Sequence, residues 1–122
     1  MLFTIDHSRF TTPRRYLCAM ERITRILAFL EQNPKDNFLR HALALEYIKT
    51  GKLEEARSLF EAVLTDSPDY VGSYYHLAKL LEQLQQTDLA IQWYEKGMEA
   101  AKAAGDNHAL NELRAAYEDL IY

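Results

Sequence analysis

The feature that most constrains this 122-residue chain is an internal repeat with a period of 34 residues. Residues 37–70 and residues 71–104 match at this offset, and the matched positions hold apolar or small residues in both copies. The matched pairs are Leu43 and Leu77, Ala44 and Ala78, Ala56 and Ala90, Phe60 and Tyr94, and Leu64 and Met98. A repeat of this length indicates stacked supersecondary units, because one unit cannot bury its apolar face without neighbours.

Apolar residues recur at helical spacing in each copy, so each copy is predicted to form two helices joined by a short turn. The chain holds only 4 glycines and 3 prolines, which also favours helices over a β-sandwich or a low-complexity chain. The predicted helices span residues 20–33, 37–49, 53–65, 70–83, 87–104 and 107–122.

Residues at the predicted helix ends have the chemistry that helix ends require. Asp36 and Asp69 are each expected to cap the helix that follows, because a short side-chain oxygen can accept hydrogen bonds from first-turn N–H groups. Gly51 is expected to end its helix in the left-handed conformation. Gln85 holds the equivalent position in the second copy, so that turn is expected to be slightly costlier. Gly97 costs a helix about 1 kcal/mol relative to alanine, and we expect it to let the final helix approach.

These residues resemble the tetratricopeptide repeat, a helix–turn–helix unit with a small residue in each helix, an aromatic residue late in the second helix and a closing proline. In the first copy the matching residues are Leu43, Ala44, Tyr47, Gly51, Ala56, Phe60 and Pro68. In the second copy they are Tyr74, Leu77, Ala78, Ala90 and Tyr94, whereas Gln85 and Lys102 stand where glycine and proline are expected. The resemblance implies an all-α fold, a right-handed superhelix of stacked antiparallel helix pairs.

The predicted organisation is a flexible N-terminal tail over residues 1–19 and one helical domain over residues 20–122. The domain is expected to comprise a helix at 20–33, the repeats 37–70 and 71–104, and a capping helix at 107–122. Residues 1–19 show neither the helical nor the strand period. Met20 directly precedes the first periodic helix, so a second explanation stays open, namely that translation starts at Met20.

Charge and cysteine content narrow the class of function. The net charge is −4, and outside residues 1–19 the chain has 11 lysines and arginines against 17 acidic residues. So acidic a domain lacks the basic surface of a nucleic-acid binder, and attachment to a membrane surface is disfavoured for the same reason. The single cysteine, Cys18, excludes an intramolecular disulfide and fits a reducing compartment, so a cytoplasmic location is predicted.

The sequence contains no recognisable constellation for catalysis, a metal or a cofactor. The four histidines are His7, His41, His76 and His108. None of them has a second histidine or a cysteine at the close spacing of a zinc site. A glycine-rich phosphate loop, a nucleophile elbow and a carboxylate pair in an apolar setting are also lacking in the sequence. A non-enzymatic protein without metal or cofactor is therefore predicted.

The resemblance implies that the first helix of each repeat lines a concave groove and that the second helix forms the convex back. Side chains of the first helices that packing does not need would then face a bound peptide or protein segment. The predicted groove residues are Phe38, His41, Leu45, Ile48, Lys49, Tyr75, Lys79 and Glu82. For Leu45, simple packing against a neighbour stays open. Grouped apolar residues mark interaction sites, so the expected ligand is an extended or helical apolar segment.

The predicted function is a non-catalytic protein-interaction module, an adaptor or scaffold that binds a peptide or protein segment in its groove. The alternative is a self-associating structural element. With only two full repeats, the first helix leaves an apolar flank that a second copy could cover. The result would be a homodimer through the exposed terminal helices.

Overall fold

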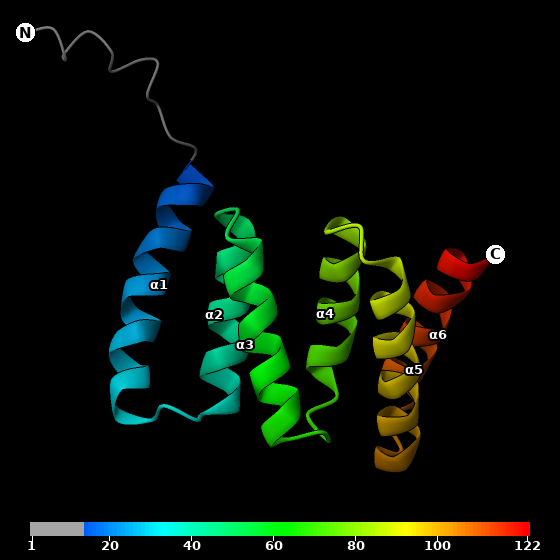
Figure 1. Ribbon diagram of the computed structural model, residues 1–122. Helices are drawn as coiled ribbons and strands as arrows, with labels where there is room; N and C mark the ends of the chain where they lie inside the picture. Colours follow the sequence, from blue (N-terminus) through cyan, green and yellow to red (C-terminus); the bar gives the residue numbers. More distant parts are fainter. Residues whose placement is uncertain (1–13) are drawn as a thin grey trace, which may run out of the picture.

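The structure, a computed structural model, describes residues 14–122, which form six α-helices and no strand. The helices are α1 (Arg14–Gln32), α2 (Asn37–Lys49), α3 (Leu53–Asp66), α4 (Gly72–Gln83), α5 (Thr87–Ala104) and α6 (Asn107–Ile121). Successive helices pack against each other, and α4 also contacts α6. Figure 1 shows α1 at one end of the row and α6 at the other. The predicted all-α fold of stacked helix pairs is confirmed.

The core lies between the helices, where small side chains let large rings enter. Four alanines of the two repeats have no exposed surface: Ala44, Ala56, Ala78 and Ala90. Small residues at a contact let helix axes approach to roughly 8–10 Å. Phe60 and Tyr94, which are equivalent residues of the two repeats, are also fully buried. The predicted packing of alanines with aromatic rings is therefore confirmed.

Several helix ends have the predicted caps. The Asp36 carboxylate accepts a hydrogen bond from the backbone N–H of Leu39 at 2.9 Å. Gly51 and Gly105 have φ of 83° and 71°, in the left-handed region that favours glycine. These caps satisfy backbone groups that a helix leaves unpaired, which is why the helices end at these residues.

Gln85 is the one described non-glycine residue with a positive φ, 64°, in the turn between α4 and α5. It follows the equivalent Gly51 by 34 positions, so the same turn is here imposed on a residue with a Cβ. The left-handed conformation costs such a residue roughly 1–2 kcal/mol. We expect Gln85→Gly to raise the free energy of unfolding, measured by urea titration, by about 0.5–1 kcal/mol, because glycine's greater unfolded-state freedom offsets part of the gain.

The matched control for this substitution is Gln86→Gly. Gln86 has φ of −104°, which any residue adopts without strain. Glycine at this position relieves nothing, so no stabilisation is expected. Equal stabilisation by both substitutions would contradict the explanation from backbone strain.

The first helix starts earlier than the sequence predicts. It begins at Arg14 rather than at Met20. The predicted tail is therefore wrong for residues 14–19, while residues 1–13 lie outside the described part of the chain. Tertiary packing explains the difference, because Ala19 is fully buried where α1 packs against α2. In the sequence Ala19 continues the helical spacing of Ile23 and Ile26, but the burial of this one small residue depends on α2, which is distant along the chain.

The fourth helix starts later than predicted, at Gly72 rather than at Tyr70. The N–H of Tyr70 donates to the carbonyl of Ser67 at 3.0 Å, and that of Val71 donates to the carbonyl of Asp69 at 2.9 Å. These bonds form a turn before α4, and no side chain caps the helix, so the predicted Asp69 cap is wrong. The predicted bounds of α2, α3, α5 and α6 agree within one residue.

Candidate peptide-binding groove

The first helices of the two repeats, α2 and α4, are joined by a polar and aromatic contact. His41 Nδ1 of α2 and Ser73 Oγ of α4 form a hydrogen bond of 2.8 Å. The rings of His41 and His76 meet edge to face, with centroids 5.3 Å apart. These contacts link α2 to α4 directly, so their side chains form one surface that crosses from the first repeat to the second.

Aromatic rings surround the two histidines. The centroid of Phe60 lies 5.4 Å from that of His41, and the centroid of Tyr70 lies 5.8 Å from it. The ring of Tyr75 stands edge-on to that of His76 at 5.7 Å. Centroids roughly 4.5–7 Å apart in edge-to-face geometry form favourable aromatic pairs. The five rings therefore form a cohesive cluster between α2 and α4.

Burial in this cluster favours the neutral form of both imidazoles. Burial, together with a smaller effect of the neighbouring His76, lowers the pKa of His41 to about 4. Burial also lowers the pKa of His76, an effect that the Glu112 carboxylate of α6 partly opposes. A neutral imidazole donates through one ring nitrogen and accepts through the other. The two rings thus offer hydrogen bonds without a full positive charge.

The structure places the eight predicted groove residues on α2 and α4, at different depths. Phe38 has an exposed fraction of 69%, and Lys49 and Lys79 are also exposed. The partly buried members are His41, Leu45, Ile48, Tyr75 and Glu82. Leu45, Ile48 and Tyr75 pack against the core, so each of them presents only part of its surface to solvent.

Glu82 has a structural contact as well as a place on the predicted groove. Its Oε2 accepts a hydrogen bond from the buried hydroxyl of Tyr94. Burial and this bond to a carboxylate raise the pKa of Tyr94 far above its ordinary value. Lys79 Nζ lies 3.9 Å from the same carboxylate oxygen. Glu82 therefore holds α5 to α4 while its partner Lys79 stays exposed.

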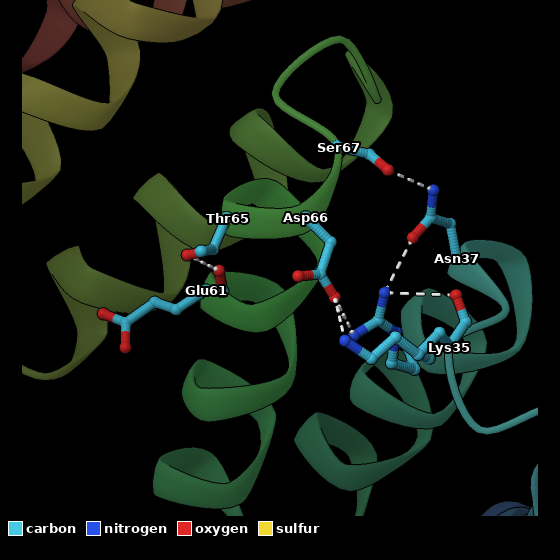
Figure 2. A network of polar contacts seen from close by, with 7 residues as sticks. Lys35, Asn37, Glu61, Thr65, Asp66 and Ser67 are labelled. Atoms are coloured by element: carbon cyan, nitrogen blue, oxygen red, sulfur yellow. Dashed lines mark hydrogen bonds and ion pairs between the residues drawn. The ribbon is translucent and has the colours of Figure 1, made fainter.

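Arg40 of α2 is buried, with an exposed fraction of 7%, and is not among the predicted site residues. Its guanidinium donates to Asp66 Oδ2 at 2.9 Å and to Asn37 Oδ1 at 2.9 Å. Asn37 Nδ2 donates in turn to Ser67 Oγ at 2.8 Å, and Figure 2 shows these groups where α2 begins and α3 ends. The network joins the beginning of α2 to the end of α3, the two helices of the first repeat. Arg40 occupies the position in the first repeat that corresponds, 34 residues later, to the buried Tyr74. This correspondence is the indication in the sequence that Arg40 is buried.

Glu46 is a second buried charged residue, with an exposed fraction of 8%, and it is also not among the predicted site residues. Its Oε2 accepts a hydrogen bond of 3.0 Å from Arg22 Nε of α1. This bond raises the pKa of Arg22. The ion pair joins α1 to α2, on which the predicted groove begins.

Within residues 14–122, no group of three or more histidine, cysteine, aspartate or glutamate side chains is placed to hold a metal ion. None of the described helices is both long enough and apolar enough to cross a bilayer.

The six helices of residues 14–122, stacked in chain order, define an α-helical repeat protein of the solenoid class. A family model for the tetratricopeptide repeat matches residues 41–109, more than half of the chain. The chain belongs to the tetratricopeptide repeat family. Domains of this family are generally protein-interaction modules.

Known proteins similar to this chain include one from Homo sapiens and two bacterial proteins of known structure. Human tetratricopeptide repeat protein 21B is 33% identical over an alignment of 108 residues, and the match covers 85% of this chain but only 8% of that protein. A tetratricopeptide repeat domain protein from Salinibacter ruber is 44% identical, with a TM-score of 0.70 over 72% of this chain and 89% of that chain. A protein from Bordetella parapertussis is 28% identical, with a TM-score of 0.71 over 80% of this chain and 85% of that chain.

Proposed function

We propose that this chain is a non-catalytic adaptor that binds a peptide or protein segment along the first helices α2, α4 and α6. The observation that supports this most is the contact of His41 with Ser73 and His76, which joins α2 to α4. A ligand that lies across both helices would meet one surface instead of two separate ones. Such a surface suits an extended or helical segment longer than a single repeat.

The side chains support a ligand with an apolar anchor. The ring of Phe38 is largely exposed, and part of Tyr75 is exposed beside His76. Aromatic rings at an interface supply contact area at a low cost in conformational entropy. The imidazoles of His41 and His76 add hydrogen-bonding groups for the backbone of the segment. We therefore propose a ligand whose large apolar side chain lies between Phe38 and Tyr75.

Charge and cysteine content support the remaining parts of the proposal. The net charge of −4 supports a protein ligand rather than a nucleic acid. The single Cys18, which is half-buried, supports a reducing location such as the cytoplasm. The absence of a catalytic constellation from the sequence supports binding as the whole of the activity.

Replacing Phe38 and Tyr75 together by alanine is expected to weaken ligand binding at least about tenfold, or about 1.4 kcal/mol, because aromatic anchors carry much of the binding energy of an interface. The probe is a set of peptides selected from a random displayed library on the intact chain. Fluorescence anisotropy then measures the dissociation constant of each peptide for the wild type and for the double variant. Circular dichroism checks that the helices remain.

The matched control is Phe29→Ala on α1. Phe29 has an exposed fraction of 61%, close to the 69% of Phe38, but it lies outside the proposed groove. Its removal is expected to leave the dissociation constants unchanged. Peptides that bind the Phe38 and Tyr75 double variant as tightly as the wild type would count against the groove.

A further inference from the structure

Helix α1 exposes most of the large apolar side chains that face solvent. Five of the eight such residues in the described part of the chain lie on it: Tyr16, Leu17, Met20, Leu27 and Phe29. Tyr16, Met20 and Leu27 have exposed fractions of 37%, 47% and 43%. They are in helical register with the partly buried Ile23 and Leu30, and we call these five residues the α1 stripe.

The internal repeat shows that Met20 and Leu27 of the α1 stripe are unusual, whereas Leu30 has the apolar equivalents Leu64 and Met98. The residues 34 and 68 positions later are Glu54 and Asp88 for Met20, and Glu61 and Glu95 for Leu27. Three of these four acidic residues are exposed and Glu61 is partly exposed, so the outer faces of α3 and α5 are solvated. On α1 the same face holds methionine and leucine. An apolar replacement at both positions indicates that this face of α1 is covered by another molecule.

A further repeat ahead of α1 would cover a different flank. The residues equivalent to Phe29 are Val63 and Gly97, and both are buried. A Cβ added at Gly97 would lie 2.7 Å from the Cβ of Tyr74, so this position faces the first helix of its own repeat. A first helix placed before α1 would therefore lie over Phe29. Met20 and Leu27, whose equivalents on α3 and α5 are exposed or partly exposed, would stay exposed.

We propose that the α1 stripe binds the α1 stripe of a second copy of this chain, with the two helices antiparallel, in a symmetric dimer. The five stripe residues are spaced 4, 3, 4 and 3 positions apart, the spacing with which two helices pack along a common seam. Reversal about the midpoint between Ile23 and Thr24 brings Met20 of one copy opposite Leu27 of the other. The same reversal brings Leu30 opposite Leu17, so four apolar residues of each α1 face apolar residues of the other copy, whereas Ile23 faces Thr24. A two-fold interface requires such a pairing of one surface with itself.

The charges of α1 also fit a second copy. With 3.6 residues per turn, Arg22 and Arg25 lie on the side of α1 away from the stripe, so arginines of the two copies would not face each other. The same reversal brings Glu31 opposite Tyr16 of the other copy. Tyr16 and Lys52 line one depression of about 220 Å³, so the carboxylate of Glu31 would face a surface to which a tyrosine and a lysine contribute.

The proposed interface is small. Helix α1 has 19 residues and is therefore about 28 Å long. A contact between two such helices is at the lower end of specific interfaces, so we expect a dissociation constant in the micromolar range. The dimer goes beyond the proposed function, because it leaves α2, α4 and α6 of each copy free. It would present two ligand sites and so bind a divalent target more tightly.

Sedimentation equilibrium of the full chain at high micromolar concentration tests the proposal. The wild type is expected to have twice the chain mass of 14.2 kDa, and the Met20→Glu/Leu27→Glu variant is expected to have the single mass. The substitutions copy Glu54 and Glu61 of α3, so the helices are expected to form, which circular dichroism checks. A monomeric wild type would overturn the proposal, even if the two substitutions lowered its stability. A dimeric double variant would also overturn it.

Two further variants test which flank of α1 makes the contact and whether the two helices are antiparallel. Phe29→Glu places a charge on the other flank of α1 and is expected to leave the dimer intact. Thr24→Cys in a Cys18→Ser background is expected to give a disulfide-linked dimer, because the two Thr24 lie beside the proposed two-fold axis. If the Thr24→Cys variant forms a dimer but no disulfide between the two copies, the antiparallel pairing is wrong. The groove variant Phe38→Ala/Tyr75→Ala is expected to stay dimeric, so the two proposals fail separately.

Discussion

Gly97→Ala is expected to destabilise the fold by about 1–2 kcal/mol, although alanine is the better helix former by about 1 kcal/mol. Gly97 is buried inside α5, and an added Cβ would lie 2.7 Å from the Cβ of Tyr74 and 3.1 Å from Cδ1 of Leu113. The Cβ of Tyr74 cannot turn away, so α4 and α5 must separate. Overpacking of this kind costs about 1–3 kcal/mol or more. We expect the midpoint of thermal unfolding to fall by ~5–10 °C.

Gly72→Ala is the matched control for this prediction. Gly72 is the exposed first residue of α4, its φ is negative, and an added Cβ would meet no atom within 4 Å. Alanine there is expected to be neutral or to stabilise by about 0.4–1 kcal/mol. A Gly97→Ala chain as stable as the Gly72→Ala chain would show that α4 and α5 do not need the close approach.

Acidification from about pH 7.5 to about pH 5 is expected to lower the free energy of unfolding by about 1–2 kcal/mol through His41 and His76. Burial lowers the pKa of both in the folded chain, that of His41 from 6.5 to about 4. The unfolded chain then binds more protons below pH 6.5, so the stabilisation is complete above 6.5 and is lost as the pH falls toward 4. Partial exposure of both rings reduces the effect. Urea titration at several pH values measures it.

The groups that face the two histidines are Ser73, Tyr70 and Tyr75, with Glu112 as the one carboxylate that acts on His76. Replacing both histidines by glutamine is expected to flatten the dependence of stability on pH between about 7.5 and 5. The control is His108→Gln, at an exposed histidine of α6. If the free energy of unfolding of the double variant depends on pH as steeply as that of the wild type, other groups cause the loss of stability in acid.

The repeat predicted most of the fold, because a period of 34 residues sets helix lengths, turn positions and the apolar face together. The equivalent pair Phe60 and Tyr94 is buried as predicted. The turn glycine Gly51 and its replacement Gln85 both have positive φ, also as predicted. Such features depend on local backbone geometry and on the spacing of side chains. Both can be read along the chain.

The depth of burial in the candidate groove could not be predicted in the same way. Helical spacing identifies which side chains share a face of α2, but burial depends on neighbours that are distant in sequence. His41 is only half-exposed because Ser73 and His76 of α4 meet it. Leu45 packs against the core and also stays partly exposed, so the packing role and the groove role are not exclusive.

Gly97 allows the close approach of a helix that the sequence predicts, but the helix that comes closest is not the predicted one. The expectation was a close approach of the final helix, and Leu113 of α6 does lie close to it. The closest atom, however, belongs to Tyr74 of α4, which Gly97 faces within its own repeat. Tyr74 takes the place of Arg40 in the first repeat, and Gly97 takes that of Val63. The bulky ring and the missing side chain are therefore two parts of one packing arrangement.

By itself the sequence determined the class of fold, the order of the helices and the inward faces of the repeat helices α2 to α5. These follow from periodicity and from the conformational preferences of single residues. Only the tertiary structure decided that residues 14–19 extend α1, that Arg40 and Glu46 are buried with partners, and that the stripe on α1 is exposed. Each of these depends on contacts between distant segments, and the energy of such a contact is set by the shape and charge of both sides.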